Sequence, residues 1–153
     1  MATTKYLYFG NQYIAEADET DTITKRYVNE PDAYTHLITQ HDVASGETSY
    51  PQYDALGSTR EVTDESETVT DTFTYDSWGN VLERTGLTTV PLQFGGEHGY
   101  YRDEETEQYY VMARIYDPQV NRWLSVDPEQ YTTLSRTLGY AYVSNSPVAL
   151  VDP

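Results

Sequence analysis

A repeated turn motif constrains this chain more than any other feature of its sequence. Tyr53-Asp54-Ala-Leu-Gly57-Ser58 returns 22 residues later as Tyr75-Asp76-Ser-Trp-Gly79-Asn80, and a weaker copy begins at Gly10-Asn11. A fixed period of this length is typical of architectures in which each repeat packs on its neighbour. Within the motif, glycine supplies a positive φ and the aspartate accepts backbone N–H groups, which predicts a tight turn.

The segments between these turns alternate with a period of two residues. In 68–75, four threonines share one face, while Val69, Phe73 and Tyr75 share the other and Asp71 interrupts the apolar face. This period indicates strands, and the 16 tyrosines of the chain favour them further. We therefore predict an all-β fold: an antiparallel, hairpin-built curved sheet over residues 1–90, with acidic hairpin tips at 18–21 and 64–67.

The pattern changes after residue 90, which predicts a second region over residues 91–153. The segment 109–116 is apolar on both faces and is expected to form one strand that is covered on both sides or faces an enclosed space. A further strand is expected over 140–143. Asp127 as an N-cap, Pro128 in the first turn and Gly139 as a stop predict one short helix near 128–138.

Charge and cysteine content exclude several classes of function. Nine Lys and Arg residues against 25 Asp and Glu residues give a formal net charge of −16. Nucleic acids and anionic membranes bind cationic surfaces, so neither is an expected partner. The absence of cysteine excludes disulfides, thiolate metal sites and a cysteine nucleophile. No apolar run reaches the roughly 18 residues of a membrane span, and the N-terminus lacks the apolar core of a signal peptide.

Further motifs follow the two Tyr-Asp repeats in order: Ala113-Arg-Ile-Tyr-Asp-Pro118, Asn121-Arg-Trp-Leu-Ser-Val-Asp-Pro128, Tyr140-Ala-Tyr-Val-Ser-Asn-Ser-Pro147 and the terminal Val-Asp-Pro153. Together these motifs cover nearly the whole chain, and they resemble those of the RHS family of Tyr-Asp repeat proteins. In this family, repeats wind as a β-strip into a hollow shell, and an RHS-associated core closes one end. The resemblance implies repeats over 1–90 and the core over 91–153.

The resemblance also implies a function. The chain is expected to be a structural, encapsulating segment that forms the shell wall and end closure upstream of a C-terminal toxin. Its partners would be the rest of its own shell and that toxin, within a larger secreted or cell-surface protein. The exposed edges of an isolated β-strip also predict self-association. The chain is expected to need no cofactor.

The family further implies an alternative, an autoproteolytic core that releases the toxin. Two carboxylates held close together share a proton and act as acid and base on a peptide bond. Asp127 is the first candidate, with Asp117 or Asp152 as the second carboxylate and Arg122 as the group that orients them. A plainer reading gives each aspartate a turn-capping role. The family cleavage sequence Asp-Pro-x-Gly-Leu is not found, because Glu129 and Gln130 follow Pro128.

A second alternative is a cell-surface or carbohydrate-binding module. Trp78 and Trp123 would be its stacking residues, although large aromatic side chains are more commonly buried. Metal binding is not expected, because His36, His41 and His98 lack ligand spacing and the tip 18–21 lacks the features of a calcium loop.

Overall fold

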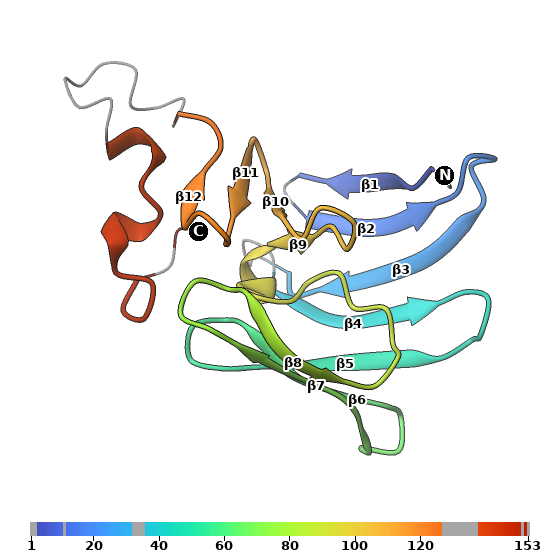
Figure 1. The fold of residues 1–153 in the computed structure, drawn as a ribbon. Coiled ribbons are helices and arrows are strands. Elements are labelled where there is room, and N and C mark those ends of the chain that lie inside the picture. The colour runs from blue at the N-terminus through green and yellow to red at the C-terminus, as the bar shows by residue number, and fades with distance from the viewer. Residues whose placement is uncertain (1–2, 11, 32–35, 127–137, 151, 153) are drawn as a thin grey trace.

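The computed structural model describes residues 3–10, 12–31, 36–126, 138–150 and 152, and it is all-β, as predicted. Eight strands, each antiparallel to the next along the chain, form one curved sheet, here called the repeat sheet (Figure 1). They are β1 (Lys5–Phe9), β2 (Gln12–Ala17), β3 (Ile23–Asn29), β4 (Leu37–Asp42), β5 (Thr48–Tyr53), β6 (Thr59–Thr63), β7 (Val69–Tyr75) and β8 (Val81–Thr85). Strand order equals chain order, which is the arrangement that consecutive hairpins produce.

The two motif turns have the same backbone geometry. In each, the aspartate Oδ1 accepts two backbone N–H groups, from Leu56 and Ser58 onto Asp54 and from Trp78 and Asn80 onto Asp76, at 2.8–3.0 Å. The glycine three residues after the aspartate has a φ of 78° at Gly57 and 93° at Gly79. Because this left-handed conformation strains residues that carry a Cβ, glycine is the favoured residue at both positions.

The acidic hairpin tips use this same turn without a glycine. Asp18 and Asp64 each accept two backbone N–H groups, and the residues three positions on, Asp21 and Glu67, have φ values of 65° and 61°. The turn therefore recurs at both ends of the strands. Six of the seven pairings between neighbouring strands also contain a register shift near a turn. Such bulges increase twist and explain the curvature of the sheet.

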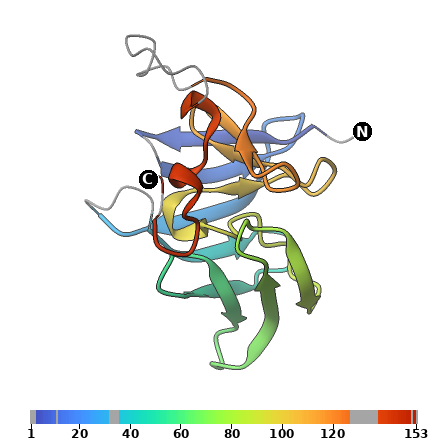
Figure 2. The same cartoon turned by 60° about the vertical axis from the view of Figure 1, so that its left-hand side comes forward.

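A second, smaller sheet follows, here called the end sheet. Its strands are β9 (Tyr101–Arg102), β10 (Tyr109–Val111), β11 (Arg114–Asp117) and β12 (Arg122–Trp123), again antiparallel in chain order. The described 3-10 turns are η1 (Gly96–His98), η3 (Leu138–Tyr140) and η4 (Val143–Asn145). Figure 2 shows the C-terminal 3-10 turns beside the end sheet, on the side where β12 lies.

Two sequence predictions for this region are wrong. The segment 109–116 is not one strand but the hairpin β10–β11, which turns at Met112 with a φ of 50°. Residues 140–143 make only an isolated bridge, Ala141 to Arg122, because the backbone turns at Val143–Asn145, where all three φ values are positive. The helix predicted near 128–138, with Asp127 as its N-cap, lies outside the described residues except for Leu138.

The core consists of three clusters joined by one segment, residues 86–100, here called the crossing loop. Val90, Leu92 and Phe94 each belong to a different cluster, so alternate residues of the loop pack against successive parts of the protein. Leu92 joins Tyr13, Tyr27 and Leu37 of the repeat sheet, and Val90 joins Val62 and Phe73. Phe94 belongs to the aromatic cluster, whose members are Phe94, Tyr100, Tyr109, Val111, Tyr116, Trp123, Tyr142 and Val143.

Asp71, which interrupts the apolar face of its strand in the sequence, lies on the buried side. Its side chain is fully buried and accepts the N–H of Thr88 at 3.0 Å, while Arg84 lies 3.8 Å away. The carbonyl of Thr88 also accepts a hydrogen bond from Arg84. Asp71 and Arg84 together hold the point where the chain leaves the repeat sheet and enters the crossing loop.

Candidate functional site: the junction between the two sheets

The motif turns of the repeat sheet form the surface on which the crossing loop lies. Thr59 donates its N–H to the carbonyl of Gln93 at 3.0 Å and its hydroxyl to that of Leu92 at 2.8 Å. Gly95 donates its N–H to Ser58 Oγ at 3.1 Å. The residues that follow Asp54 in the motif therefore hydrogen-bond to the backbone of the crossing loop.

The second motif turn packs against Phe94 of the crossing loop and hydrogen-bonds to the end sheet and its β11–β12 turn. The hydroxyl of Tyr109 donates to the carbonyl of Gly79 at 2.8 Å, and that of Tyr116 donates to the carbonyl of Trp78 at 2.7 Å. Asn80, at the position equivalent to Ser58, donates its amide to the carbonyl of Pro118 at 3.0 Å. The two copies of one sequence motif thus hydrogen-bond to two different segments of the C-terminal half.

The tyrosine of each motif has a common role that explains its identity. The hydroxyl of Tyr53 donates to the carbonyl of Leu37 at 2.9 Å, and that of Tyr75 donates to the carbonyl of Thr59 at 2.8 Å. The offset along the chain is 16 residues in both cases. Each hydroxyl therefore joins its own strand to the strand before it, β5 to β4 and β7 to β6. Phenylalanine could not make this bond.

Phe94 is the centre of the aromatic cluster. Its ring lies 5.9–6.5 Å, between centroids, from the rings of five tyrosines: Tyr75, Tyr100, Tyr109, Tyr116 and Tyr142. Burial raises the pKa of Tyr142 to about 12 and raises that of Tyr116 still higher. These phenols are neutral at physiological pH and act as hydrogen-bond donors, so the junction is apolar and held by directed hydroxyl contacts.

Of the candidate catalytic residues, the structure describes Asp117, Arg122 and Asp152, each with its own partners. Asp117 caps a turn, because its Oδ1 accepts the N–H of Gln119 at 2.9 Å and its Oδ2 accepts the amide of Gln108 at 3.2 Å. Arg122 is exposed and pairs with Asp117 only as its neighbour in the β11–β12 ladder. Asp127 lies outside the described residues.

Asp152 is held by residues that the sequence did not single out. Arg114 Nη2 lies 3.1 Å from Asp152 Oδ2, and the hydroxyl of Tyr100 donates to the Asp152 carbonyl at 2.7 Å. The Arg114 guanidinium also lies over the ring of Trp123, 3.9 Å from its centroid. The signal was present in Ala113-Arg-Ile-Tyr-Asp-Pro118, but pairing Arg114 with a residue 38 positions away requires the fold.

The two tryptophans are packing residues. Trp123 is 2% exposed within the aromatic cluster, and Trp78 packs against the same cluster while half-buried. Trp123 therefore offers no face on which a sugar ring could stack. Among the described residues, no three His, Asp or Glu side chains are grouped as metal ligands.

The geometry defines a class of protein: a strip of antiparallel β-hairpins in tandem, against whose motif turns a distinct C-terminal β unit is packed. Residues 22–148 match the family model described as Teneurin YD-shell, so this chain belongs to the YD-shell family. The resemblance to RHS and Tyr-Asp repeat proteins is confirmed, and the chain is a segment of such a shell.

Known relatives are much longer proteins. The tRNA nuclease WapA of Bacillus subtilis (strain 168) is 32% identical over 98% of this chain, which spans 6% of that protein. The double-stranded DNA deaminase toxin A of Burkholderia cenocepacia is 29% identical over 99% of this chain, which spans 11% of it. The crystal structure of TcdB2-TccC3 has the same fold, with a TM-score of 0.74 at 22% identity over 99% of this chain and 8% of that one.

No helix within the described part of the chain has the length and apolar character needed to cross a membrane.

Proposed function

We propose that this chain forms the last part of the wall and the end closure of a shell that encloses a C-terminal toxin. The observation that carries the proposal is the junction: the motif turns that build the wall also bind the crossing loop and the end sheet. We propose the division into repeats over 1–90 and core over 91–153 on the same basis. That relatives of this chain include a tRNA nuclease and a DNA deaminase toxin supports a toxic cargo. We propose a secreted or cell-surface location for the whole protein.

Protease protection in the full-length parent protein tests this proposal. We expect the domain downstream of the core to resist trypsin in the native protein and to be digested once Phe94→Ala disrupts the aromatic cluster. Val148→Ala is the matched control, because Val148 is an exposed apolar residue of the same region. A downstream domain that is digested equally in all three proteins would contradict enclosure.

Self-cleavage is a second candidate function, favoured by the anchoring of Asp152. The guanidinium of Arg114 and the hydroxyl of Tyr100 fix this aspartate next to Pro153, as a reacting carboxylate near a scissile bond requires. We propose Asp152 and Asp127 as the carboxylate pair, with Arg114 as the positioning residue. Asp117 and Arg122 stay candidates from the sequence, although the Asp117 carboxylate is engaged in its turn.

The cleavage proposal predicts two fragments when the chain is expressed with its native downstream sequence. Asp152→Asn and Asp127→Asn should each leave a single intact product, because an amide cannot share or transfer the proton. Asp117→Asn should still be cut. Electrophoresis and intact mass measure the outcome, and a wild-type protein that remains whole would exclude self-cleavage in this member.

We also propose that the isolated chain self-associates through the edge of β1. This strand has one neighbour, β2, within the described sheet, and its Phe9 is 77% exposed. An apolar strand with one unpaired edge is a template for another strand. We expect the weight-average mass in sedimentation to rise with concentration, and Phe9→Lys to suppress the rise. Leu150→Lys, on the C-terminal segment, should not suppress it.

A further inference from the structure

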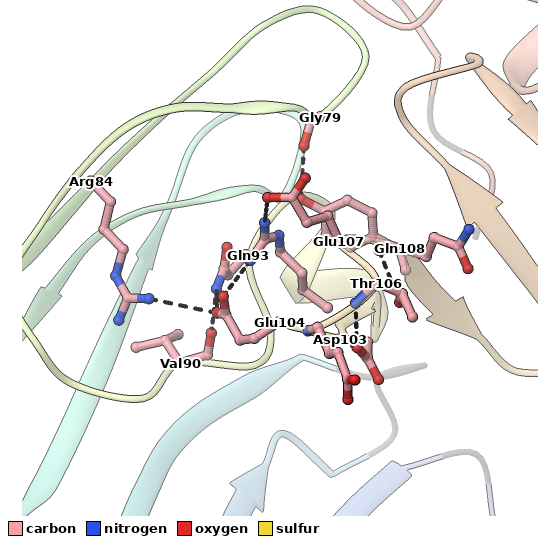
Figure 3. A network of polar contacts seen from close by, with 12 residues as sticks. Gly79, Arg84, Val90, Gln93, Asp103, Glu104, Thr106, Glu107 and Gln108 are labelled. Carbon is pink, nitrogen blue, oxygen red and sulfur yellow. Dashed lines mark hydrogen bonds and ion pairs between the residues drawn. The ribbon is translucent and has the colours of Figure 1, made fainter.

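One carboxylate joins the repeat sheet, the crossing loop and the end sheet. Glu104 follows β9, and its Oε2 lies 2.5 Å from Nη1 of Arg102 in that strand. Its Oε1 accepts the amide of Gln93 at 2.9 Å and lies 3.6 Å from Nη1 of Arg84 in β8. Figure 3 shows Glu104 between Arg84 and Gln93, with Glu107 on the far side of the network. Two arginines from different sheets therefore share Glu104.

The ion pairs of Glu104 can break without leaving a buried arginine unpaired. Arg102 is 9% exposed and keeps a second partner, Glu107, whose Oε1 lies 3.3 Å from its Nη2. Arg84 keeps Asp71 and the carbonyl of Thr88. An unpaired buried charge would destabilise either sheet strongly, but here each arginine retains a carboxylate. The Glu104 side chain itself is 52% exposed, so water can solvate its carboxylate when these ion pairs break.

We propose that Glu104 is an ionic latch that holds the end sheet on the wall and that can open while both sheets stay folded. The proposal rests on the closure function above, for which the latch would be the releasable contact. Screening by salt weakens half-exposed ion pairs far more than it weakens apolar packing. The latch therefore makes the closure sensitive to ionic strength, whereas the aromatic cluster alone would not.

Hydrogen exchange on the isolated chain tests the latch. In Glu104→Gln, amides of β10, β11 and β12 should exchange about threefold faster than in the wild type, the size expected for a partly exposed charged contact. Amides of β3 to β7 should keep their rates. Raising the sodium chloride concentration from about 0.05 to about 0.5 M shortens the screening length. It should accelerate exchange of the same end-sheet amides in the wild type but not in Glu104→Gln.

Glu105→Gln is the matched control, because Glu105 lies in the same loop and has no ion pair among the described residues. It should leave all rates unchanged. Equal acceleration in both sheets would show a global loss of stability and overturn the latch, as would unchanged rates in Glu104→Gln. Either result leaves protease protection of the downstream domain as a separate test, so failure of the latch and failure of enclosure are distinguishable.

Discussion

Raising the pH from 9 to about 11 is expected to unfold this protein in one cooperative step. Burial is the main cause that raises the pKa of ten tyrosines: Tyr6, Tyr13, Tyr27, Tyr53, Tyr75, Tyr100, Tyr101, Tyr109, Tyr116 and Tyr142. Several of them donate their hydroxyl to a backbone carbonyl, a bond that the phenolate cannot make.

The direction follows from proton linkage. A tyrosine whose pKa is higher in the folded than in the unfolded state stabilises the fold fully below the unfolded pKa near 10. That contribution is lost as the pH rises toward the folded pKa, which is about 12 for Tyr142 and higher for Tyr116. At pH 11 each such group favours the unfolded state by about 1.4 kcal/mol. Summed over the ten tyrosines this is at most about 14 kcal/mol, which is comparable with the roughly 5–15 kcal/mol that holds a domain folded.

Absorbance at 295 nm, which reports tyrosinate, and far-ultraviolet circular dichroism measure the transition on the same sample. We expect both signals to change together at one midpoint between about pH 10 and 11, with the spectrum at pH 9 equal to that at pH 7. Gradual ionisation centred on pH 10 with an unchanged dichroism spectrum would show that the phenols are not buried as described.

The wall of this protein was predictable from its sequence because its interactions are local. Asp54 and Gly57 fix a turn within five residues, and the two-residue alternation of 68–75 fixes a strand, so both the hairpins and their order follow. The acidic tips were also placed correctly. Their likeness to the motif turn was not predicted, because Glu67 occupies the position at which the motif has a glycine.

The junction was not predictable, because it depends on contacts between residues far apart in the chain. Val90, Leu92 and Phe94 lie at alternate positions, as in a strand, but their partners lie in three different clusters. The turn at Met112 lacks a glycine or asparagine, so the segment reads as one strand. Arg122 was predicted to orient the carboxylates, and the fold in addition brings Arg114 to Asp152, 38 positions away.

Gly79→Ala is expected to destabilise the protein by roughly 2–5 kcal/mol, mainly by displacing the crossing loop. A Cβ at this position would lie 2.6 Å from the ring of Phe94, which is buried among five other rings and has little room to move. The left-handed backbone at Gly79 adds about 1–2 kcal/mol of strain for any residue with a Cβ. Overpacking a buried ring adds about 1–3 kcal/mol more.

Gly46→Ala separates the cost of backbone strain from the cost of overpacking against Phe94. Gly46 has a φ of 76°, close to that of Gly79, but a Cβ there would have no atom within 4 Å. It should therefore cost only the backbone strain, about 1–2 kcal/mol. Urea unfolding of both variants measures the difference, and the excess for Gly79→Ala is the energy of the contact with Phe94. Equal losses in the two variants would mean that the crossing loop does not rest on the motif turn, and the junction that carries the closure would lose its structural basis.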